Sequence, residues 1–404
     1  MTIQKSDFLI VGAGIIGFAV ARSLHRREPG SSIRILEKES SAGCHASGRN
    51  SGVLHAGFYY SEDSLKARFT RDGNQRMRAY CAEHALPIHS CGKLVVANCE
   101  AQIAGLEELF RRATRNGIET ALISAIEARE LEPRVRTVGK ALWSPTTSSV
   151  NPLDILHSLE RELAAARIQI DKGVCYESGG SALVKSNKGR YSAGHLINAA
   201  GLYADRIAHG LGFGLKYRVA PFKGLYLYAN QRIGPFRRHL YPVPDLNNPF
   251  LGVHFTLTVD HGVKIGPTAI PALWREQYSG LKGFNLKEAG EAVLNNAALF
   301  FKDPHVYRKL AVQEIRKNFK KAMVDEAARM ASDVDDSMFS DWGPPGIRAQ
   351  LLDISKRSLV GDFVVEGDEN STHILNAVSP AFTCAFPFAD YVAERIVGKR
   401  LLEP

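Results

Sequence analysis

The sequence predicts an α/β protein with two domains, one built around a parallel sheet and one around an antiparallel sheet. The chain has 404 residues, which is long for a single hydrophobic core. Between residues 7 and 37, a strand pattern, three spaced glycines and a helix pattern follow one another. Between residues 218 and 266, the strand patterns are longer and richer in aromatic residues, which favours an antiparallel sheet.

The N-terminal stretch has the pattern of a strand, a helix and a second strand. Phe8–Val11 is short, apolar and partly β-branched, as expected of a parallel strand that is buried on both faces. Apolar residues recur at four-residue spacing from Ile16 to Leu24 and predict a helix that stops before Pro29. Ile33–Leu36 predicts the second strand.

Three glycines lie between the first strand and the helix, with the spacing of a dinucleotide-binding fingerprint. In such a motif Gly12 makes a tight turn, Gly14 lets the backbone approach a pyrophosphate, and Gly17 lets the helix pack closely on the strand. The helix N-terminus then faces the anion. Glu37 follows where a carboxylate accepts the hydroxyls of an adenosine ribose. A glycine-rich turn without a ligand is the alternative, and the fingerprint does not distinguish NAD from FAD.

Composition and charge are those of an ordinary globular protein. Hydrophobic residues make up 45% and charged residues 23%, which argues against long disordered segments. The formal net charge is +9, from 51 basic and 42 acidic residues, and it favours acidic ligands or an anionic surface. The six cysteines show no C-x-x-C pair and no matching histidine spacing. We therefore expect mostly buried thiols and no metal site.

No pattern in the sequence indicates secretion or a membrane span. Only six residues precede Asp7, where the first strand pattern starts, and no apolar run reaches the roughly 18 to 20 residues that a span needs. We therefore expect a cytoplasmic enzyme. Residues 302–329 carry eight basic and four acidic side chains around an apolar line. This segment is either a solvated outer face or a docking surface for anionic lipids at the inner face of a membrane.

A polar stretch, residues 44–69, has an unusual composition for a connection. It combines small hydrogen-bond donors with His45, Arg49 and His55, as in a loop built for ligand contact. A polar loop with incidental histidines is the alternative. The helix that follows is expected at about 64–82, capped by Ser61 or Asp63.

The remaining pattern alternates strands and helices. Residues 195–198 predict a strand that leads into Ala199-Ala200-Gly201, a second place where bare backbone can approach a ligand. Residues 342–345 have the composition of a boundary between domains. Further strands are expected near 93–97, 168–170, 225–228, 240–243, 251–257, 263–265, 348–351 and 373–377, and further helices near 101–116, 126–131, 152–166, 284–331 and 385–397.

Specific motifs recur along nearly the whole chain. They are GAGIIG, ASGRNSGVLHAGFYYSEDSLKA, CGKLVVA, LINAAGLYADRIA, APFKGLY, LYPVPD, PFLGVHFT and GIRAQ. In this combination the sequence resembles the L-2-hydroxyglutarate dehydrogenase/oxidase family, within the D-amino-acid oxidase-like flavoenzymes. The resemblance implies FAD rather than NAD. We expect the flavin to be bound non-covalently, and a covalent link through His45 is left open as the alternative. The resemblance also implies a Rossmann-like FAD-binding domain from residues 1–85, 146–217 and 336–404, and a substrate domain with a large mixed or antiparallel sheet from residues 86–145 and 218–335.

The resemblance assigns the cofactor contacts to separated places in the sequence. The N-terminal amides of the last helix are expected near the flavin N1 and C2 carbonyl, where they stabilise a negative ring. The ADP half is assigned to Gly12, Gly14, Ile15, Ile16, Gly17, Glu37 and Lys38, and adenine to the backbone of Val174. The pyrophosphate and isoalloxazine are assigned to Ser47, Asn50, Ser51, Gly52, Ala200, Gly201, Ser379, Pro380, Ala381 and Phe382.

The implied reaction is oxidation of a 2-hydroxy acid, most directly L-2-hydroxyglutarate to 2-oxoglutarate. A hydride must leave the α-carbon for flavin N5 while a base removes the hydroxyl proton. We expect His55 to be the base, with His254 as the alternative. Arg348 stands where related flavin oxidases bind a carboxylate, and its guanidinium fork matches that group. The candidates for a distal carboxylate are Lys223, Tyr226, Tyr241 and Lys66.

The sequence departs from the family pattern in two places, and several alternatives stay open. GPTA stands at residues 266–269 where GPNA is expected, and Phe382 adds bulk where the family has alanine, which leaves substrate length open. An amino-acid or amine oxidase and a non-catalytic flavin-binding module are the competing functions. Oxygen, a quinone and an electron-transfer protein are all open as electron acceptors, and no feature predicts nucleic-acid binding.

Overall fold

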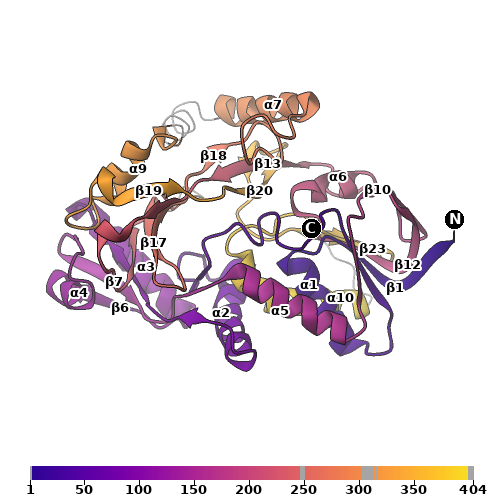
Figure 1. Ribbon diagram of the computed structural model, residues 1–404, viewed down its shortest axis with the longest axis horizontal. Helices are drawn as coiled ribbons and strands as arrows, with labels where there is room; N and C mark the ends of the chain where they lie inside the picture. Colours follow the sequence, from indigo (N-terminus) through magenta and orange to yellow (C-terminus); the bar gives the residue numbers. More distant parts are fainter. Residues whose placement is uncertain (1, 246–250, 303–313, 315, 399–404) are drawn as a thin grey trace. The chain divides into compact units, whose positions relative to one another are not determined.

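The computed structural model describes residues 2–245, 251–302, 314 and 316–398. The chain forms two compact units, each assembled from separated segments (Figure 1). Unit 1 contains residues 1–50, 152–221 and 348–404, and unit 2 contains residues 51–151 and 222–347. The assignment of one domain to FAD and one to substrate, with the boundaries given above, stays a prediction.

Unit 1 is organised around a largely parallel sheet. Its path is β10-β11-β12-β1-β2-β9, and β23 joins on β12 with β22 beside it. The pairs β1–β12, β1–β2, β2–β9 and β12–β23 are parallel. The strands of this sheet are β1 Ile3–Val11, β2 Ile33–Glu37, β9 Gln169–Lys172, β10 Tyr176–Gly180, β11 Leu183–Ser186, β12 Gly189–Asn198, β22 Val365–Gly367 and β23 Ser371–Ile374. Unit 1 also contains β21 Ser358–Leu359, which is not part of this sheet.

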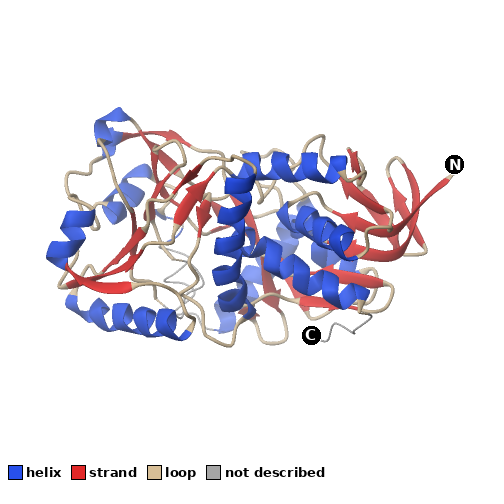
Figure 2. Cartoon of the chain, turned by 90° about the horizontal axis from the view of Figure 1, so that it is seen from below, coloured by secondary structure: helices blue, strands red, loops and turns tan. Residues whose placement is uncertain are grey.

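Helices cover this sheet, and they lie beside its strands in the part of Figure 2 that carries the N-terminus. They are α1 Ile15–Arg27, α5 Pro152–Ala165, α6 Ala204–His209 and α10 Ala381–Val397. The first helix packs against α10 and α5. Its buried positions include four small residues, Gly17, Ala19, Ala21 and Ser23, which allow this close packing. The strand–helix–strand expectation for residues 7–37 is confirmed.

Unit 2 is organised around a mixed eight-stranded sheet, in the order β19-β14-β17-β16-β15-β5-β7-β6. The expectation of an antiparallel sheet is correct for most neighbours, but β5 and β15 are parallel. The strands of this sheet are β5 Lys93–Val96, β6 Ala121–Ser124, β7 Lys140–Ser144, β14 Leu227–Ala229, β15 His239–Pro242, β16 His254–Leu257, β17 Val263–Gly266 and β19 Phe339–Trp342.

Smaller elements complete unit 2. A three-stranded sheet, β3-β8-β4, contains Val53–Leu54, Ser148–Val150 and Ile88–His89. The helices are α2 Leu65–Glu83, α3 Ile103–Arg115, α4 Ala125–Leu131, α7 Leu286–Lys302 and α9 Lys320–Ala327. The part of strand β13 (Tyr217–Gly224) that belongs to unit 2 pairs with β18, Ile270–Pro271. The strand β20, Gly346–Asp353, pairs in unit 1 with β21.

The large sheet of unit 2 has two chemically different faces. Strand register places Leu94, Leu240 and Phe255 on one face. There they form a core with apolar residues of β7, β14, β17, α4 and α9. The alternate positions point to the other face, because side chains along a strand alternate. That face carries Lys93, His239, Tyr241, His254, Thr256 and Lys264, and we call it the polar face.

Several local expectations are wrong. The cap of α2 is Ser64, whose hydroxyl accepts a hydrogen bond from the Ala67 amide, and not Ser61 or Asp63. The last helix begins at Ala381, directly after Pro380, rather than near residue 385. The boundary expected from residues 342–345 is close to the observed one: Trp342 ends β19, which pairs with β14, and the division between the units falls between Ile347 and Arg348.

Other expectations are met only in part. Three of the six cysteines are buried, at positions 81, 91 and 384. In the basic segment 302–329, residues 303–313 and 315 lie outside the described residues. In the part of the chain that the structure describes, no helix is both long enough and apolar enough to cross a bilayer.

Candidate functional site

The glycine fingerprint of unit 1 is enforced by the backbone around it. Gly12 has a φ of +110°, and a Cβ there would lie 2.5 Å from the Ala199 carbonyl oxygen. A Cβ at Gly17 would lie 1.9 Å from the carbonyl oxygen of Gly12. A Cβ at Gly14 would lie 2.9 Å from the Ser47 hydroxyl oxygen. Side chains are therefore excluded where the resemblance places the pyrophosphate, and this backbone fits a dinucleotide.

Glu37 ends β2 beside this turn and is held by two backbone amides. The Ala13 amide donates to one carboxylate oxygen and the Glu39 amide to the other, both at 2.9 Å. Each oxygen keeps a lone pair for a further donor, such as a ribose hydroxyl. The Val174 amide donates to the Glu37 carbonyl at 2.8 Å, so the predicted adenine contact and the predicted ribose contact are neighbours.

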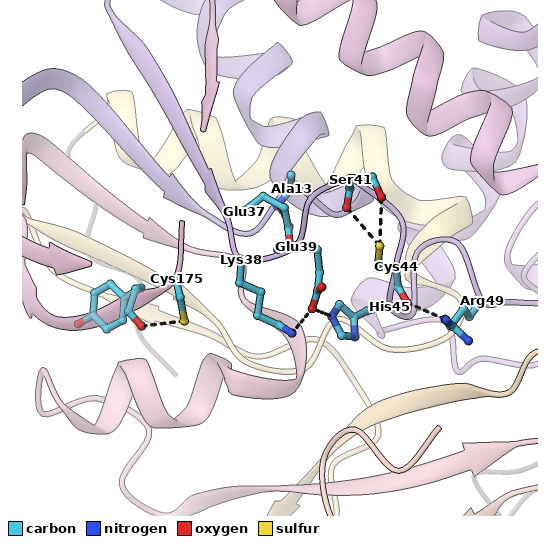
Figure 3. A network of polar contacts seen from close by, with 10 residues as sticks. Ala13, Glu37, Lys38, Glu39, Ser41, Cys44, His45, Arg49 and Cys175 are labelled. Carbon is cyan, nitrogen blue, oxygen red and sulfur yellow. Dashed lines mark hydrogen bonds and ion pairs between the residues drawn. The ribbon is translucent and has the colours of Figure 1, made fainter. Parts of the chain in front are cut away.

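A second carboxylate, Glu39, forms a small polar network beside Glu37 (Figure 3). Lys38 Nζ lies 2.5 Å and His45 Nε2 lies 2.9 Å from the same Glu39 oxygen. The hydrogen bond from Lys38 is the main reason why the pKa of Glu39 is lowered, and His45 adds to it. These contacts hold the predicted cofactor residue Lys38 at the end of β2.

The other predicted cofactor residues of unit 1 gather at the same end of the sheet. Ser47 accepts a hydrogen bond from the Ile15 amide at 3.0 Å and so caps α1, while Asn50 donates to the Ser47 carbonyl at 2.7 Å. The Ala199 amide donates to the Val11 carbonyl at 3.0 Å, which places Ala200 next to the glycine turn. Exposed Ser379 and buried Pro380 lead directly into α10.

His55 belongs to unit 2, directly after β3, and its backbone is fixed from α2. Buried Asn74 donates from its side-chain amide to the carbonyl oxygens of Leu54, His55 and Thr146 at 3.1–3.2 Å. Burial and the nearby charge of Lys93 lower the pKa of His55 to about 3, so the imidazole is neutral at physiological pH. A neutral imidazole has a nitrogen that can accept a proton, which is the first requirement of a general base.

We predict that Asn74→Ala lowers the thermal midpoint of the protein markedly. The change leaves three backbone carbonyls without this donor, and an unsatisfied buried group costs about 1–3 kcal/mol. Asn187→Ala is the matched control, because exposed Asn187 makes two hydrogen bonds at the surface. Thermal unfolding of the two variants checks the prediction, and equal losses in both would contradict it.

Lys93 is the least expected residue of the polar face. Its side chain is fully buried, and its Nζ lies 4.5 Å from the ring centre of Phe58 and 4.7 Å from those of Tyr59 and Tyr241. Among the described residues, this nitrogen has no hydrogen-bond or ion-pair partner. Burial lowers the pKa of Lys93 to about 7, whereas it raises the pKa of both tyrosines.

The polar face carries His239 and His254, which differ in their hydrogen bonding. His239 accepts the Leu257 amide at Nδ1 at 3.0 Å, which leaves its proton on Nε2 beside Cys91 and Ser149. This histidine is therefore a satisfied structural residue. His254 stacks on Tyr241 with ring centres 3.7 Å apart, and its Nδ1 donates to the Gly252 carbonyl at 2.9 Å. Its Nε2 is then the basic nitrogen, as an alternative base requires.

The other predicted substrate residues are spread over both units. Lys66, on α2, is buried rather than exposed, with its Nζ 5.8 Å from the Tyr60 ring centre. Half-buried Lys223 lies on β13, and Tyr226 is buried beneath Lys264. Arg348 is half buried on β20 and belongs to unit 1. The structure thus brings His55, His254 and Tyr241 into one cluster with Lys93, and the roles of all these residues stay predictions.

The sequence interpretation gave no role to Lys93, Asn74, Tyr59 and Thr256, which lie in or beside this cluster. Lys93 opens the strand KLVV, whose other residues are all buried and apolar. A lysine at an in-register position of a buried strand is a usable signal, since lysine is almost never fully buried without a reason. The contacts of the other three depend on pairing between distant segments, which the sequence alone does not show.

Comparisons with known proteins agree with this geometry. The family model of FAD dependent oxidoreductases matches residues 7–395. L-2-hydroxyglutarate dehydrogenase of Salmonella houtenae is 32% identical, over 98% of this chain and 94% of that protein. The protein of the same name from Indibacter alkaliphilus is 34% identical, over 96% and 97%. The human mitochondrial protein of that name is 31% identical, over 96% and 88%.

Solved structures share the fold. The L-α-glycerophosphate oxidase of Mycoplasma pneumoniae, reduced and with FAD bound, superimposes with a TM-score of 0.74 at 20% identity, over 100% of this chain and 97% of that one. Glycine oxidase of Geobacillus kaustophilus gives 0.72 at 18% identity, over 99% and 97%. With the family model, the full-length relatives and the cradle in unit 1 taken together, the chain belongs to the FAD-dependent oxidoreductase family that includes the L-2-hydroxyglutarate dehydrogenases.

Proposed function

We propose that this enzyme oxidises L-2-hydroxyglutarate to 2-oxoglutarate. The observation that carries the proposal is the 31–34% identity to L-2-hydroxyglutarate dehydrogenases from bacteria and animals over nearly the whole chain. The glycine turn of unit 1 and the buried basic groups of unit 2 support the proposal, because oxidation of a dicarboxylic hydroxy acid needs a cofactor site, a base and cations that bind the carboxylates.

Each part of the reaction has a candidate group in the chain. The substrate loses a hydride from its α-carbon and a proton from its hydroxyl group. FAD, when bound, supplies the hydride acceptor. His55 accepts the hydroxyl proton, and its neutral state suits that role. Arg348 binds the α-carboxylate through two parallel hydrogen bonds. In unit 1, the turn at Gly12, Gly14 and Gly17 and the Glu37 carboxylate hold the ADP half of the cofactor.

Anaerobic bleaching of the flavin tests the function. L-2-hydroxyglutarate should bleach the yellow holoenzyme, whereas its D enantiomer, lactate and glycine should leave it yellow or react far more slowly. Bleaching by glycine with none by L-2-hydroxyglutarate would replace the proposal with oxidation of a C–N bond.

We expect Arg348→Lys to weaken substrate binding by about 10- to 100-fold, since lysine cannot form the planar two-bond fork. The absorption spectrum of the bound flavin should stay unchanged, because the substitution leaves the cofactor site intact. Titration of the holoenzyme with 2-oxoglutarate measures the affinity. Arg357→Lys is the control, since Arg357 is exposed, and wild-type affinity in Arg348→Lys would remove the anchor role.

The second substrate is an electron acceptor, and oxygen, a quinone and an electron-transfer protein remain the candidates. We propose a cytoplasmic location, and as an alternative a location at the membrane surface through contact with anionic lipid. Co-sedimentation with vesicles that contain anionic lipid tests this alternative, and the absence of salt-sensitive binding would count against it.

A further inference from the structure

We propose that Lys93, together with the hydroxyl groups of Tyr59, Tyr241 and Thr256, forms a binding site for the distal carboxylate of the substrate. This inference rests on the proposed function and extends it, because it assigns the residues that distinguish a dicarboxylic acid from a monocarboxylic one. Of these four residues, the sequence motifs indicated only Tyr241 as a candidate for binding the distal carboxylate. The other three candidates, Lys223, Tyr226 and Lys66, lie elsewhere.

The site is built by strand register and one turn. On β15, Tyr241 stands in register with Val95 and His239 with Lys93, so these four side chains share the polar face. Phe58 and Tyr59 come from the turn between β3 and α2, and their rings with that of Tyr241 surround the Lys93 nitrogen. Three walls are therefore aromatic, and the lysine is fixed at their centre.

Four buried polar atoms in this cluster lack a hydrogen-bond partner within the described ranges of the chain. They are Lys93 Nζ and the hydroxyl oxygens of Tyr59, Tyr241 and Thr256, out of ten such atoms in all. They also lie near one another. The Lys93 nitrogen lies 4.7 Å from the centres of both tyrosine rings, and the two tyrosines interact electrostatically. The Thr256 hydroxyl lies close to that of Tyr241, but the two do not have the geometry of a full hydrogen bond.

The chemistry of the four atoms selects the ligand. An ammonium group offers only donors, and each hydroxyl can donate one hydrogen bond. The titratable side chains near these atoms are those of His55, His239, His254, Tyr60, Tyr226 and Cys91. Within the described part of the chain, no carboxylate perturbs Lys93 or the two tyrosines. A carboxylate has two oxygens and about four acceptor positions, so it matches a set of donors that a single water molecule cannot satisfy.

The position of the site also suits the reaction. Lys93 is close enough to His55 for its charge to lower the pKa of that histidine. In L-2-hydroxyglutarate, two CH₂ groups separate the distal carboxylate from the carbon that carries the hydroxyl. An acid held at Lys93 therefore presents its hydroxyl group in the neighbourhood of His55.

The test compares glutarate, which has two carboxylates, with butyrate, which has one. Both are unreactive and can be titrated into the holoenzyme by calorimetry. Lys93→Met should lower the affinity for glutarate by about 10- to 100-fold and leave that for butyrate within about twofold. Methionine has a similar length and suits an aromatic cage, so the variant should fold. Lys264→Met is the matched control, because Lys264 is also buried on the polar face over tyrosine rings.

The pH dependence gives a second readout. Since the pKa of Lys93 is lowered to about 7, the free site loses its charge above that pH, and glutarate affinity should fall from pH 7 to 9. Lys93→Met should remove this fall. The pKa values of His55 and His239 are lowered, so both are neutral in this range, and the pKa values of the two tyrosines are raised, so they ionise only at higher pH.

Three outcomes would overturn the inference: an unchanged glutarate-to-butyrate ratio in Lys93→Met, an equal loss in Lys264→Met, or a glutarate affinity that ignores pH. The outcome is independent of catalysis. If L-2-hydroxyglutarate fails to bleach the wild-type flavin, the proposed function fails, while the glutarate titrations still decide whether Lys93 binds a carboxylate. If bleaching succeeds and the ratio is unchanged, only the Lys93 site is refuted.

Discussion

Replacement of His55 by alanine should leave a yellow holoenzyme that L-2-hydroxyglutarate reduces about 10²- to 10⁴-fold more slowly, the usual contribution of a general base. The reason is that the hydroxyl proton then has no neutral imidazole to accept it. The backbone of residue 55 is held by Asn74 through carbonyl groups, which the substitution keeps. The loop should therefore retain its conformation and the protein its FAD. Anaerobic stopped-flow reduction at several substrate concentrations separates the reduction rate from binding.

Two further variants make this result specific. His157→Ala is the control for loss of a histidine, since His157 is exposed on α5. His254→Ala tests the alternative base, whose Nε2 is the basic nitrogen. Near-normal reduction in His55→Ala with a large loss in His254→Ala would transfer the role to His254.

The pH dependence of kcat/KM in the wild-type enzyme should also reflect the lowered pKa of His55. An ordinary histidine base would make kcat/KM fall as the pH drops below about 6.5. Because the pKa of His55 is lowered to about 3, its basic form persists through the whole range from pH 7 to pH 5. We therefore expect kcat/KM to show no histidine-like loss in this range.

Gly17→Ala should abolish FAD binding. Its Cβ would lie 1.9 Å from the Gly12 carbonyl oxygen and 3.5 Å from the Ile10 side chain, so α1 cannot keep its position against β1. A shift of α1 also moves the amides that face the pyrophosphate. We expect at least a 100-fold loss of FAD affinity, since each tenfold step corresponds to about 1.4 kcal/mol and an overpacked core costs about 1–3 kcal/mol or more.

Gly30→Ala is the matched control, because a Cβ at that position meets no atom within 4 Å. Flavin absorbance after gel filtration, with circular dichroism to confirm folding, measures both variants. A folded Gly17→Ala protein with a full complement of FAD would show that the fingerprint does not hold the cofactor in the way that its geometry indicates.

The cofactor half of the molecule could be predicted from the sequence because its determinants are local. Gly12, Gly14 and Gly17 act within one turn, and the strand before them and the helix after them are neighbours in the chain. The end of the same sheet also receives Ala200, which the strand pattern before it indicated, and Val174, which the sequence indicated only through the family resemblance. Cofactor contacts by these residues remain predictions.

The residues of the substrate half were harder to predict from the sequence, for a physical reason. Lys93 and Tyr241 are 148 residues apart and meet because β5 and β15 pair in parallel, a pairing that no local pattern reveals. The same applies to Asn74, which holds Leu54 and Thr146 together from a helix. Smaller errors came from competing local signals. Three polar residues before α2 could each cap it, and only the backbone conformation at Ser64 selects one.

The two faces of the large sheet set stability and activity against each other. One face packs only into an apolar core, whereas the other, which also buries Val95 and Leu142, keeps the Lys93 ammonium group and the hydroxyls of Tyr241 and Thr256, with that of Tyr59 beside them, away from water without hydrogen-bond partners in the described part of the protein. Substitutions such as Lys93→Met or Thr256→Val should therefore raise the melting temperature of the ligand-free protein. Laboratory selection for heat resistance alone would be expected to remove these residues first, so a screen for a more robust enzyme must include the diacid in its assay.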